Sequence, residues 1–354
     1  MIERDDLRAA VSAGIVTERQ AASLASLADS RRGARENLAA GDEPFELFKG
    51  FNEIFIVVGL GILATGYAAV AGLYVASALG GWVERVIPVT ILGAIFTWAL
   101  SEYFIRHRRM VAPAIALAML WAGNASVGFT AWFAQPFMVA QEDFSSLPLP
   151  LALTTVALFG HWLRFRVPFA LALVAIGAFI VALVLAADQA GSPRDVSDLF
   201  LLSAGGPFAW ITLALGIVVF ALAMAFDMSD PHRVTRRAAN GFWLHVVAAP
   251  ALVNTVALTL LDAGSNALLF VTLMLFALVA IIIDRRSFLI AAVGYSVALA
   301  WVVFDGEGGA WTVLTLGLVL VLLGAFWERI RAVLLGALGP VLPLKRLPPS
   351  VIHD

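Results

Sequence analysis

The chain has 354 residues, of which 61% are hydrophobic and 14% charged, and its formal net charge is −2. Soluble domains are roughly 45–50% apolar and about 25% charged, so this composition excludes an ordinary water-soluble fold and predicts a membrane protein. The balanced charge excludes a basic nucleic-acid-binding domain. The absence of cysteine excludes disulfides, thiolate catalysis and cysteine-bound metals.

The first 50 residues are polar and mixed in charge, without the basic start and apolar run of a cleavable signal. Leu7–Val11 predicts a short amphipathic helix that ends near Gly14. Thr17 and Gln20 have capping-box spacing, so a second helix should follow, and then a charged linker. We therefore expect residues 1–50 to form a cytoplasmic helical hairpin plus linker, which either docks on the membrane domain or a protein partner, or stays solvated.

Ten stretches are apolar and long enough to cross a bilayer, which needs about 17 to 20 such residues. They are 54–78, 86–104, 110–134, 148–164, 167–187, 207–226, 241–261, 267–283, 287–304 and 310–327. The fourth is the weakest, because prolines crowd its start and His161 lies near its end. The sequence thus predicts an all-α polytopic bundle of about ten transmembrane helices over residues 51–328, followed by a cytoplasmic or interfacial tail at 329–354.

Lys and Arg residues predict the orientation of the bundle, because they are enriched in cytoplasmic loops. With ten spans, 21 of the 23 fall in the N-terminal segment, the tail and the alternate loops between them. The opposite loops hold only Arg85 and Arg194. Both termini are therefore expected in the cytoplasm.

Two apolar segments resemble each other and indicate an internal repeat. Ala209–Gly216 and Ala310–Gly317 share five of eight residues, and Arg-rich turns precede the third and seventh predicted spans. This pattern favours a four-helix repeat in parallel orientation, with spans 3–6 and 7–10 as its two copies. Chance similarity among helices rich in Ala, Leu, Val and Gly is the alternative.

Few polar residues lie within the predicted spans. No Asp, Glu, Lys or Arg lies in the middle third of any span, which argues against transport coupled through a central carboxylate. The candidate polar membrane positions are His245, Asn254, Asn124, His161 and Asn240. Each amide either lines a polar cavity or forms a hydrogen bond across a helix interface.

His245 is the strongest single candidate. A buried neutral imidazole can bind a ligand or relay a proton, and His245 together with His161 could hold a cofactor. The alternative is that each histidine satisfies a local backbone carbonyl near the inner interface. Asn240 and His245 lie about 140° apart around a helix, so they are not expected to converge on one site.

Motifs of enzymes and cofactor sites are absent from the sequence. It contains no HExxH, no GxSxG and no calcium loop, and Gly59 and Gly61 lie inside an apolar span, where we interpret them as helix-packing glycines. We therefore predict no catalytic residue, no cofactor and no metal, and an enzyme is not the expected class.

Local sequence runs resemble known proteins. The hairpin with its Ala13–Thr17 turn, the charged linker and the many-span bundle resemble bacterial polytopic inner-membrane families of unknown function. The run Arg236–Pro250 with Asp284–Arg286 is similar to a pattern in their alphaproteobacterial members. The resemblance covers part of the chain, and it implies a bacterial inner-membrane location and an architecture, but no activity.

The sequence favours a permease- or flippase-like bundle for a small neutral or lipidic solute, because of the repeat and of Pro250 and Gly294 within spans. The alternative is a non-catalytic structural or regulatory membrane protein that binds a partner through its N-terminal hairpin. A membrane enzyme that uses His245 and His161 is the third hypothesis. The expected partners are the lipid bilayer and a protein that binds the hairpin, and nucleic acid is excluded.

Overall fold

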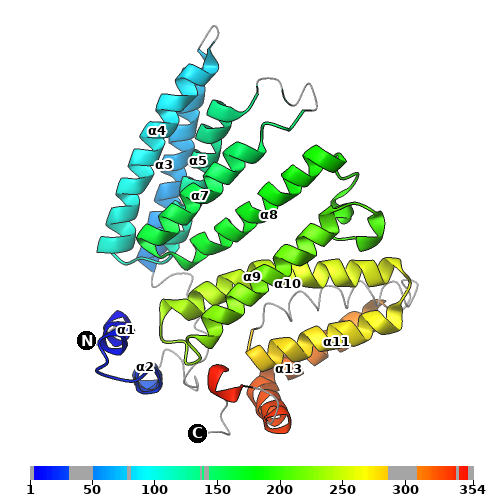
Figure 1. Ribbon diagram of the computed structural model, residues 1–354. Coiled ribbons are helices and arrows are strands. Elements are labelled where there is room, and N and C mark those ends of the chain that lie inside the picture. The colour runs from blue at the N-terminus through cyan, green and yellow to red at the C-terminus, as the bar shows by residue number, and fades with distance from the viewer. Residues whose placement is uncertain are drawn as a thin grey trace. The chain divides into compact units, whose positions relative to one another are not determined.

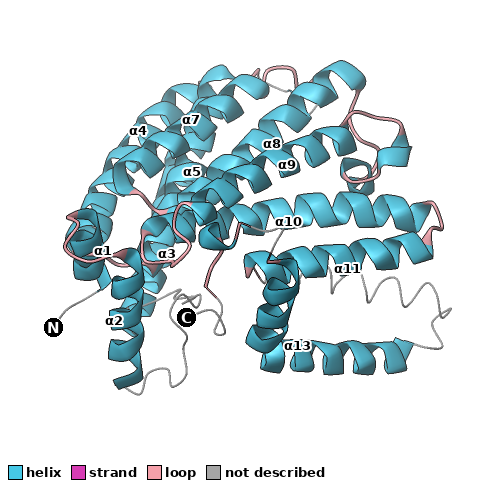
Figure 2. Ribbon diagram, turned by 60° about the horizontal axis from the view of Figure 1, so that its bottom comes forward, coloured by secondary structure: helices cyan, strands magenta, loops and turns pink. Residues whose placement is uncertain are grey.

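The computed structural model describes residues 4–31, 51–77, 81–135, 138, 143–285, 309–339 and 343–349. Within these residues the chain consists of helices joined by turns and loops, without a strand (Figure 2). The chain divides into two compact units. We call Pro44–Ser192 the first unit, and Pro193–Asp354 together with Met1–Glu43 the second unit.

The first unit is a bundle of long apolar helices (Figure 1). It contains α3 (Phe51–Ala76), α4 (Trp82–Ser101), the π-helix η1 (Glu102–His107), α5 (Ala112–Phe133), α7 (Pro148–Phe165) and α8 (Pro168–Ala190). Proline stands at the first or second position of α5, α7 and α8, where its missing N–H would have had no helical partner. The core includes Leu60, Leu117 and Phe165. Ile62 and Leu73 of α3 are 70% and 74% exposed, as expected for side chains that face lipid.

The second unit combines the N-terminal hairpin with the C-terminal helices. It contains α1 (Arg4–Ser12), α2 (Glu18–Arg31), η2 (Val196–Leu199), η3 (Leu202–Ala204), α9 (Phe208–Met228), α10 (Arg236–Asp262), α11 (Asn266–Ile283), α13 (Gly309–Leu338) and η4 (Leu344–Arg346). Helices α9, α10 and α11 follow one another through short turns. Their core includes Leu252, Val253, Leu269 and Leu273.

Seven of the described helices are long and apolar enough to cross a membrane. They are Phe51–Ala76, Trp82–His107, Ala112–Phe133, Pro168–Ala190, Phe208–Met228, Arg236–Asp262 and Asn266–Ile283. They match predicted spans one to three and five to eight, so the prediction of an all-helical, multi-pass membrane protein is confirmed. Helices α7 and α13 cover the fourth and tenth predicted spans but are not among the seven. The ninth predicted span, 287–304, lies outside the described residues, so the total of ten stays a prediction.

The division into units does not follow the predicted repeat. The boundary falls after Ser192, between the fifth and sixth predicted spans. A four-helix repeat would instead start its two copies at the third and seventh spans, near residues 110 and 241. The repeat therefore stays a prediction.

The N-terminal hairpin folds as its capping signals predict. Gly14 adopts a left-handed φ of 71° between α1 and α2. The Thr17 backbone N–H donates to Gln20 Oε1 over 2.9 Å, and the Gln20 backbone N–H donates to Thr17 Oγ1 over 3.3 Å. Arg8 Nε then donates to the backbone oxygen of Val234, in the turn between α9 and α10, over 3.1 Å. The hairpin thus contacts the turn between α9 and α10, and a protein partner for it stays a prediction.

The glycines of α3 do not pack as expected. Among the described residues, a Cβ at Gly59 or Gly61 would meet no atom within 4 Å, so their interpretation as helix-packing glycines is wrong for this part of the chain. A close approach occurs instead at Gly93 of α4. A Cβ there would lie 2.4 Å from Asn124 Oδ1 of α5, so a larger residue would displace the Asn124 side chain.

Candidate functional site

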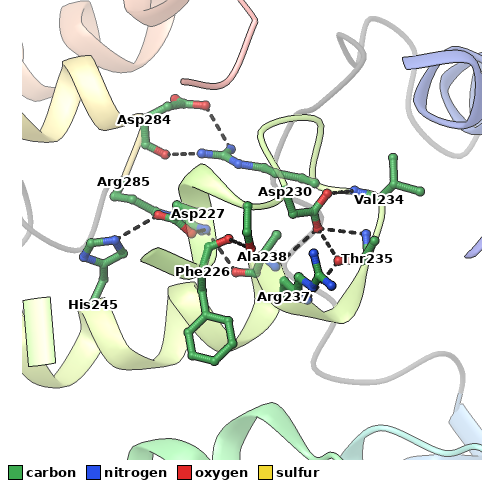
Figure 3. A network of polar contacts seen from close by, with 12 residues as sticks. Phe226, Asp227, Asp230, Val234, Thr235, Arg237, Ala238, His245, Asp284 and Arg285 are labelled. Atoms are coloured by element: carbon green, nitrogen blue, oxygen red, sulfur yellow. Dashed lines mark hydrogen bonds and ion pairs between the residues drawn. The ribbon is translucent and has the colours of Figure 1, made fainter. Parts of the chain in front are cut away.

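A buried ion pair joins the end of α9 to the turn after α11. Asp227 is the last residue but one of α9. Its Oδ1 accepts a hydrogen bond from Arg285 Nη2 over 2.6 Å, and its Oδ2 accepts one from Arg285 Nε over 3.0 Å (Figure 3). Arg285 Nη2 also donates to the backbone oxygen of Ala238 in α10, over 3.0 Å. Because Arg285 is only 1% exposed, contacts within the protein and not water compensate its buried charge.

His245 completes the cluster from the third turn of α10. Its Nε2 lies 2.9 Å from Asp227 Oδ2, and since the carboxylate accepts, the imidazole carries its proton on Nε2 (Figure 3). The His245 side chain is fully buried, and the Phe220 ring of α9 lies edge-on to it at 5.5 Å. We call Asp227, His245 and Arg285 the carboxylate cluster. It ties α9, α10 and the end of α11 together at one point.

Gly241 makes room for this cluster. A Cβ at Gly241 would lie 2.1 Å from Asp227 Oδ1 and 3.2 Å from the backbone oxygen of Ala223. The carboxylate therefore rests directly on the backbone of α10, where every larger residue would displace it.

The turn between α9 and α10 is organised by a second buried carboxylate. Asp230, which is 1% exposed, accepts hydrogen bonds from the backbone N–H of Val234 (3.1 Å) and from the N–H and hydroxyl of Thr235 (2.8 and 2.7 Å) (Figure 3). Thr235 Oγ1 in turn accepts from the backbone N–H of Arg237, as an N-cap residue does. The negative charge thus lies at the positive end of the α10 dipole, where it is stabilised.

A third contact ties α13 to the same region. Arg233 donates to Asp284 through Nη1 to Oδ2 (2.9 Å) and Nη2 to the backbone oxygen (2.7 Å). Asp284 Oδ1 accepts from Trp327 Nε1 of α13 over 2.6 Å. Both Arg233 and Asp284 adopt left-handed backbone conformations, with φ of 54° and 55°. Strained residues of this kind persist only where their contacts hold them, as these do.

The hairpin adds a titratable group to the turn between α9 and α10. Burial is the main cause that raises the pKa of Glu18 above its ordinary value of 4.5, and the negative charge of Asp230 raises it further. A raised pKa means that the docked hairpin binds the proton more tightly than the free hairpin does. Docking is therefore strongest below about pH 4.5 and weakens as the pH rises through the raised value.

Replacing Glu18 by Gln should strengthen hairpin docking at pH 7 and remove its dependence on pH, because the buried charge is gone. Amide hydrogen exchange of residues 4–28 in the full chain, at pH 5 and pH 7 and corrected for intrinsic rates, measures this. The wild type should be protected more at pH 5, and E18Q equally at both. Asp143→Asn, in the first unit, is the control and should behave as wild type. Equal protection of the wild-type hairpin at both pH values would contradict the prediction.

The structure places His245 in the carboxylate cluster, and not on a backbone carbonyl as expected. His161 likewise has a side-chain neighbour: its Nε2 lies 3.4 Å from Ser101 Oγ, and the Trp98 and Trp121 rings lie 6.2 and 5.9 Å away. The carbonyl interpretation is therefore wrong for the Nε2 atom of both histidines. His161 belongs to the first unit and His245 to the second, so the alternative of a cofactor shared by the two is not tested.

The predicted amides have separate surroundings. Asn124 Nδ2 donates to the backbone oxygen of Thr90 in α4 over 2.9 Å, so Asn124 forms the expected hydrogen bond across a helix interface. Asn240 is buried beside Gly241, and its Oδ1 has no hydrogen-bond partner among the described residues. Asn254 is half-buried on α10. None of the three contributes a hydrogen bond to the carboxylate cluster in the described part of the chain.

Asp227 and Arg285 are the site residues that the sequence reasoning missed. The sixth predicted span ended at residue 226, which left Asp227 in a loop. Arg285 was counted only as one of the basic residues of a cytoplasmic turn. In the residues that the structure describes, no group of three or more His, Asp or Glu side chains could hold a metal. The place that a cation would take beside Asp227 is taken by the Arg285 guanidinium.

A comparison with known proteins leaves this site without a precedent. No known family, no curated protein and no solved structure matches the chain. The resemblance to bacterial inner-membrane families of unknown function therefore stays a prediction, and the function has to be argued from the carboxylate cluster itself.

Proposed function

We propose that the chain is a permease-like protein of the bacterial inner membrane that moves a small neutral or lipidic solute, and that the carboxylate cluster locks one state of its transport cycle. The observation that carries the proposal is the meeting of Asp227, His245 and Arg285, all buried, at the ends of three apolar helices. Ionisable groups are costly in membrane segments, and they usually mark functional positions there.

A purely stabilising role explains the cluster less well. Replacing a whole buried ion pair by packed apolar side chains is often neutral or stabilising, so stability alone does not require an Asp and an Arg at these positions. What a buried pair does provide is specificity for one arrangement, because any other arrangement leaves its charges without partners. Among the described residues, the carboxylate cluster holds α9, α10 and α11 in that way near one end of these helices.

A proline inside a long apolar helix supports the same proposal. Pro250 inside α10 adds a point at which a backbone hydrogen bond is missing, as at the broken helices of transporters.

The basic turns support a cytoplasmic location of both termini. In the first unit, Arg106 and Arg164 share Glu102. In the second unit, Arg233 and Arg285 lie in turns that open toward the docked hairpin and the C-terminal segment. Within each unit the basic turns thus gather at the same ends of the helices, as the positive-inside rule requires.

Flux into liposomes tests the proposal. Glycerol uptake, followed by light scattering, probes a small neutral solute, and dithionite bleaching of headgroup-labelled phosphatidylcholine probes a lipid. The wild type should move one of the two probes faster than empty liposomes do. Asp227→Asn should lower that flux at least tenfold, because it removes a charge-assisted hydrogen bond worth about 1.5–3 kcal/mol from the locked state and depopulates that state.

The matched control is Asp143→Asn, which makes the same chemical change at an exposed loop position and should leave the flux unchanged. Absence of flux for both probes in the wild type argues against a permease. Unchanged flux in D227N, with normal insertion, would show that the cluster has no part in transport.

A further inference from the structure

A second charged surface lies in the first unit, where two turns meet. The turn from η1 to α5 and the turn from α7 to α8 are joined through Glu102. Its Oε1 lies 2.7 Å from Arg164 Nη2, and its Oε2 accepts from Arg106 Nη1 over 3.3 Å. The two turns together carry five arginines with exposed side chains, Arg106, Arg108, Arg109, Arg164 and Arg166, which we call the arginine surface.

The arginine surface has an excess of positive charge. Among the described residues, two carboxylates contact these turns. Glu102 is shared between two of the arginines, and Glu53 is buried and accepts from the backbone N–H groups of Val111 and Ala112 at the start of α5. In the described part of the chain, Arg106, Arg108, Arg164 and Arg166 therefore outnumber Glu102, the one carboxylate of these two that is not buried.

The backbone conformation at these turns favours a binding role for the arginine side chains. Arg109 and Arg166 adopt left-handed φ values of 52° and 54°, a conformation in which glycine is the default residue. Arg166, whose side chain is exposed, in addition lies over the Trp162 ring, with its Cζ 4.9 Å from the ring centroid. A ligand bound by the two side chains would explain why arginine and not glycine stands at these two strained positions.

The residues next to the arginine surface indicate the chemical class of the ligand that it binds. Phe159 and Leu163 of α7, directly beside Arg164, are 42% and 45% exposed, so an apolar face of the helix begins where the charged surface ends. Trp162, an amphipathic ring typical of membrane interfaces, stacks on Phe159 at 5.6 Å. A ligand that fits both faces has an anionic head next to an acyl chain.

We propose that the arginine surface binds the phosphate headgroups of anionic phospholipids in the inner leaflet. The planar guanidinium offers two parallel donors to a phosphate, and several arginines on adjacent turns hold one or two headgroups while the acyl chains lie along α7. The inference rests on the cytoplasmic location of these turns and does not depend on transport, so a protein without measurable flux would still bind the lipid.

Native mass spectrometry of the delipidated full chain in detergent tests this site. Dioleoylphosphatidylglycerol is the anionic probe, dioleoylphosphatidylcholine the zwitterionic one, and inorganic phosphate the soluble competitor. We expect the anionic lipid to bind more tightly than the zwitterionic one. Replacing both Arg108 and Arg166 by Gln should weaken its binding about thirtyfold, or about fivefold for each arginine.

A second variant is expected to bind the anionic lipid more tightly, and a folding defect would not produce that result. Glu102→Gln releases Arg106 and Arg164 from their shared carboxylate, so it should strengthen binding of the anionic lipid about fivefold. Arg85→Gln, in the first turn of α4, where Arg85 donates to Ser77 Oγ, is the matched control and should bind as wild type.

Three results would overturn the proposal. The first is equal binding of the two lipids, and the second is unchanged affinity in both R108Q/R166Q and E102Q. The third is displacement of the anionic lipid by an equal concentration of inorganic phosphate, which would make a soluble anion the ligand.

Discussion

Replacing Asp227 by Ala is expected to destabilise the protein by about 3–5 kcal/mol, the usual cost of removing one partner of a buried ion pair. The Arg285 guanidinium would lose both of its carboxylate contacts while it stays buried, and His245 Nε2–H would lose its acceptor. Unfolding by sodium dodecyl sulfate in mixed micelles, followed by tryptophan fluorescence, gives the change. Asp188→Ala, at an exposed position of α8, is the control and should alter stability by less than about 0.5 kcal/mol.

The double variant D227A/R285M tests whether Asp227 and Arg285 stabilise the protein as a pair. If the cost of D227A comes from an uncompensated Arg285 charge, removing that charge as well should recover most of the lost stability, because Met fills part of the same volume without a charge. The double variant should then be more stable than D227A alone but should still transport poorly, since the specific lock is absent. Additive losses from the two substitutions would show that the two side chains do not act as a pair.

The sequence predicts well what hydrophobicity and local spacing decide. Long apolar runs identify seven helices that can cross a membrane, and the Thr17 and Gln20 spacing identifies the start of α2. Both are short-range signals. A helix needs only its own residues to be apolar, and a capping box needs only residues three positions apart.

The carboxylate cluster depends on contacts that no local pattern encodes. Asp227 meets His245 across 18 positions and Arg285 across 58. Placed at the end of a span and in a basic turn, the two charged residues look like ordinary interfacial charges. The one local signal was Gly241, because a glycine inside a helix often marks a close approach, but a glycine does not say what approaches it.

The same distinction explains the histidines. The sequence predicted that His245 and His161 would be buried, because each lies in an apolar span, and both are fully buried. It could not predict their neighbours, since the hydroxyl of Ser101 lies 60 positions from His161. Burial follows from composition, whereas the identity of a hydrogen-bond partner follows from tertiary packing.

Replacing Gly241 by Ala should therefore cost about 2–4 kcal/mol, although Gly to Ala within a helix normally gains up to about 1 kcal/mol. The added Cβ would lie 2.1 Å from Asp227 Oδ1, so either the carboxylate leaves its two arginine contacts or α9 and α10 separate. Gly123→Ala in α5 is the matched control, because a Cβ there meets no described atom within 4 Å, and it should be neutral or stabilising in the same detergent unfolding measurement. Since the clash acts through Asp227, G241A should cost much less in a D227A background. An equal cost in both backgrounds would mean that Gly241 serves helix packing and not the carboxylate cluster.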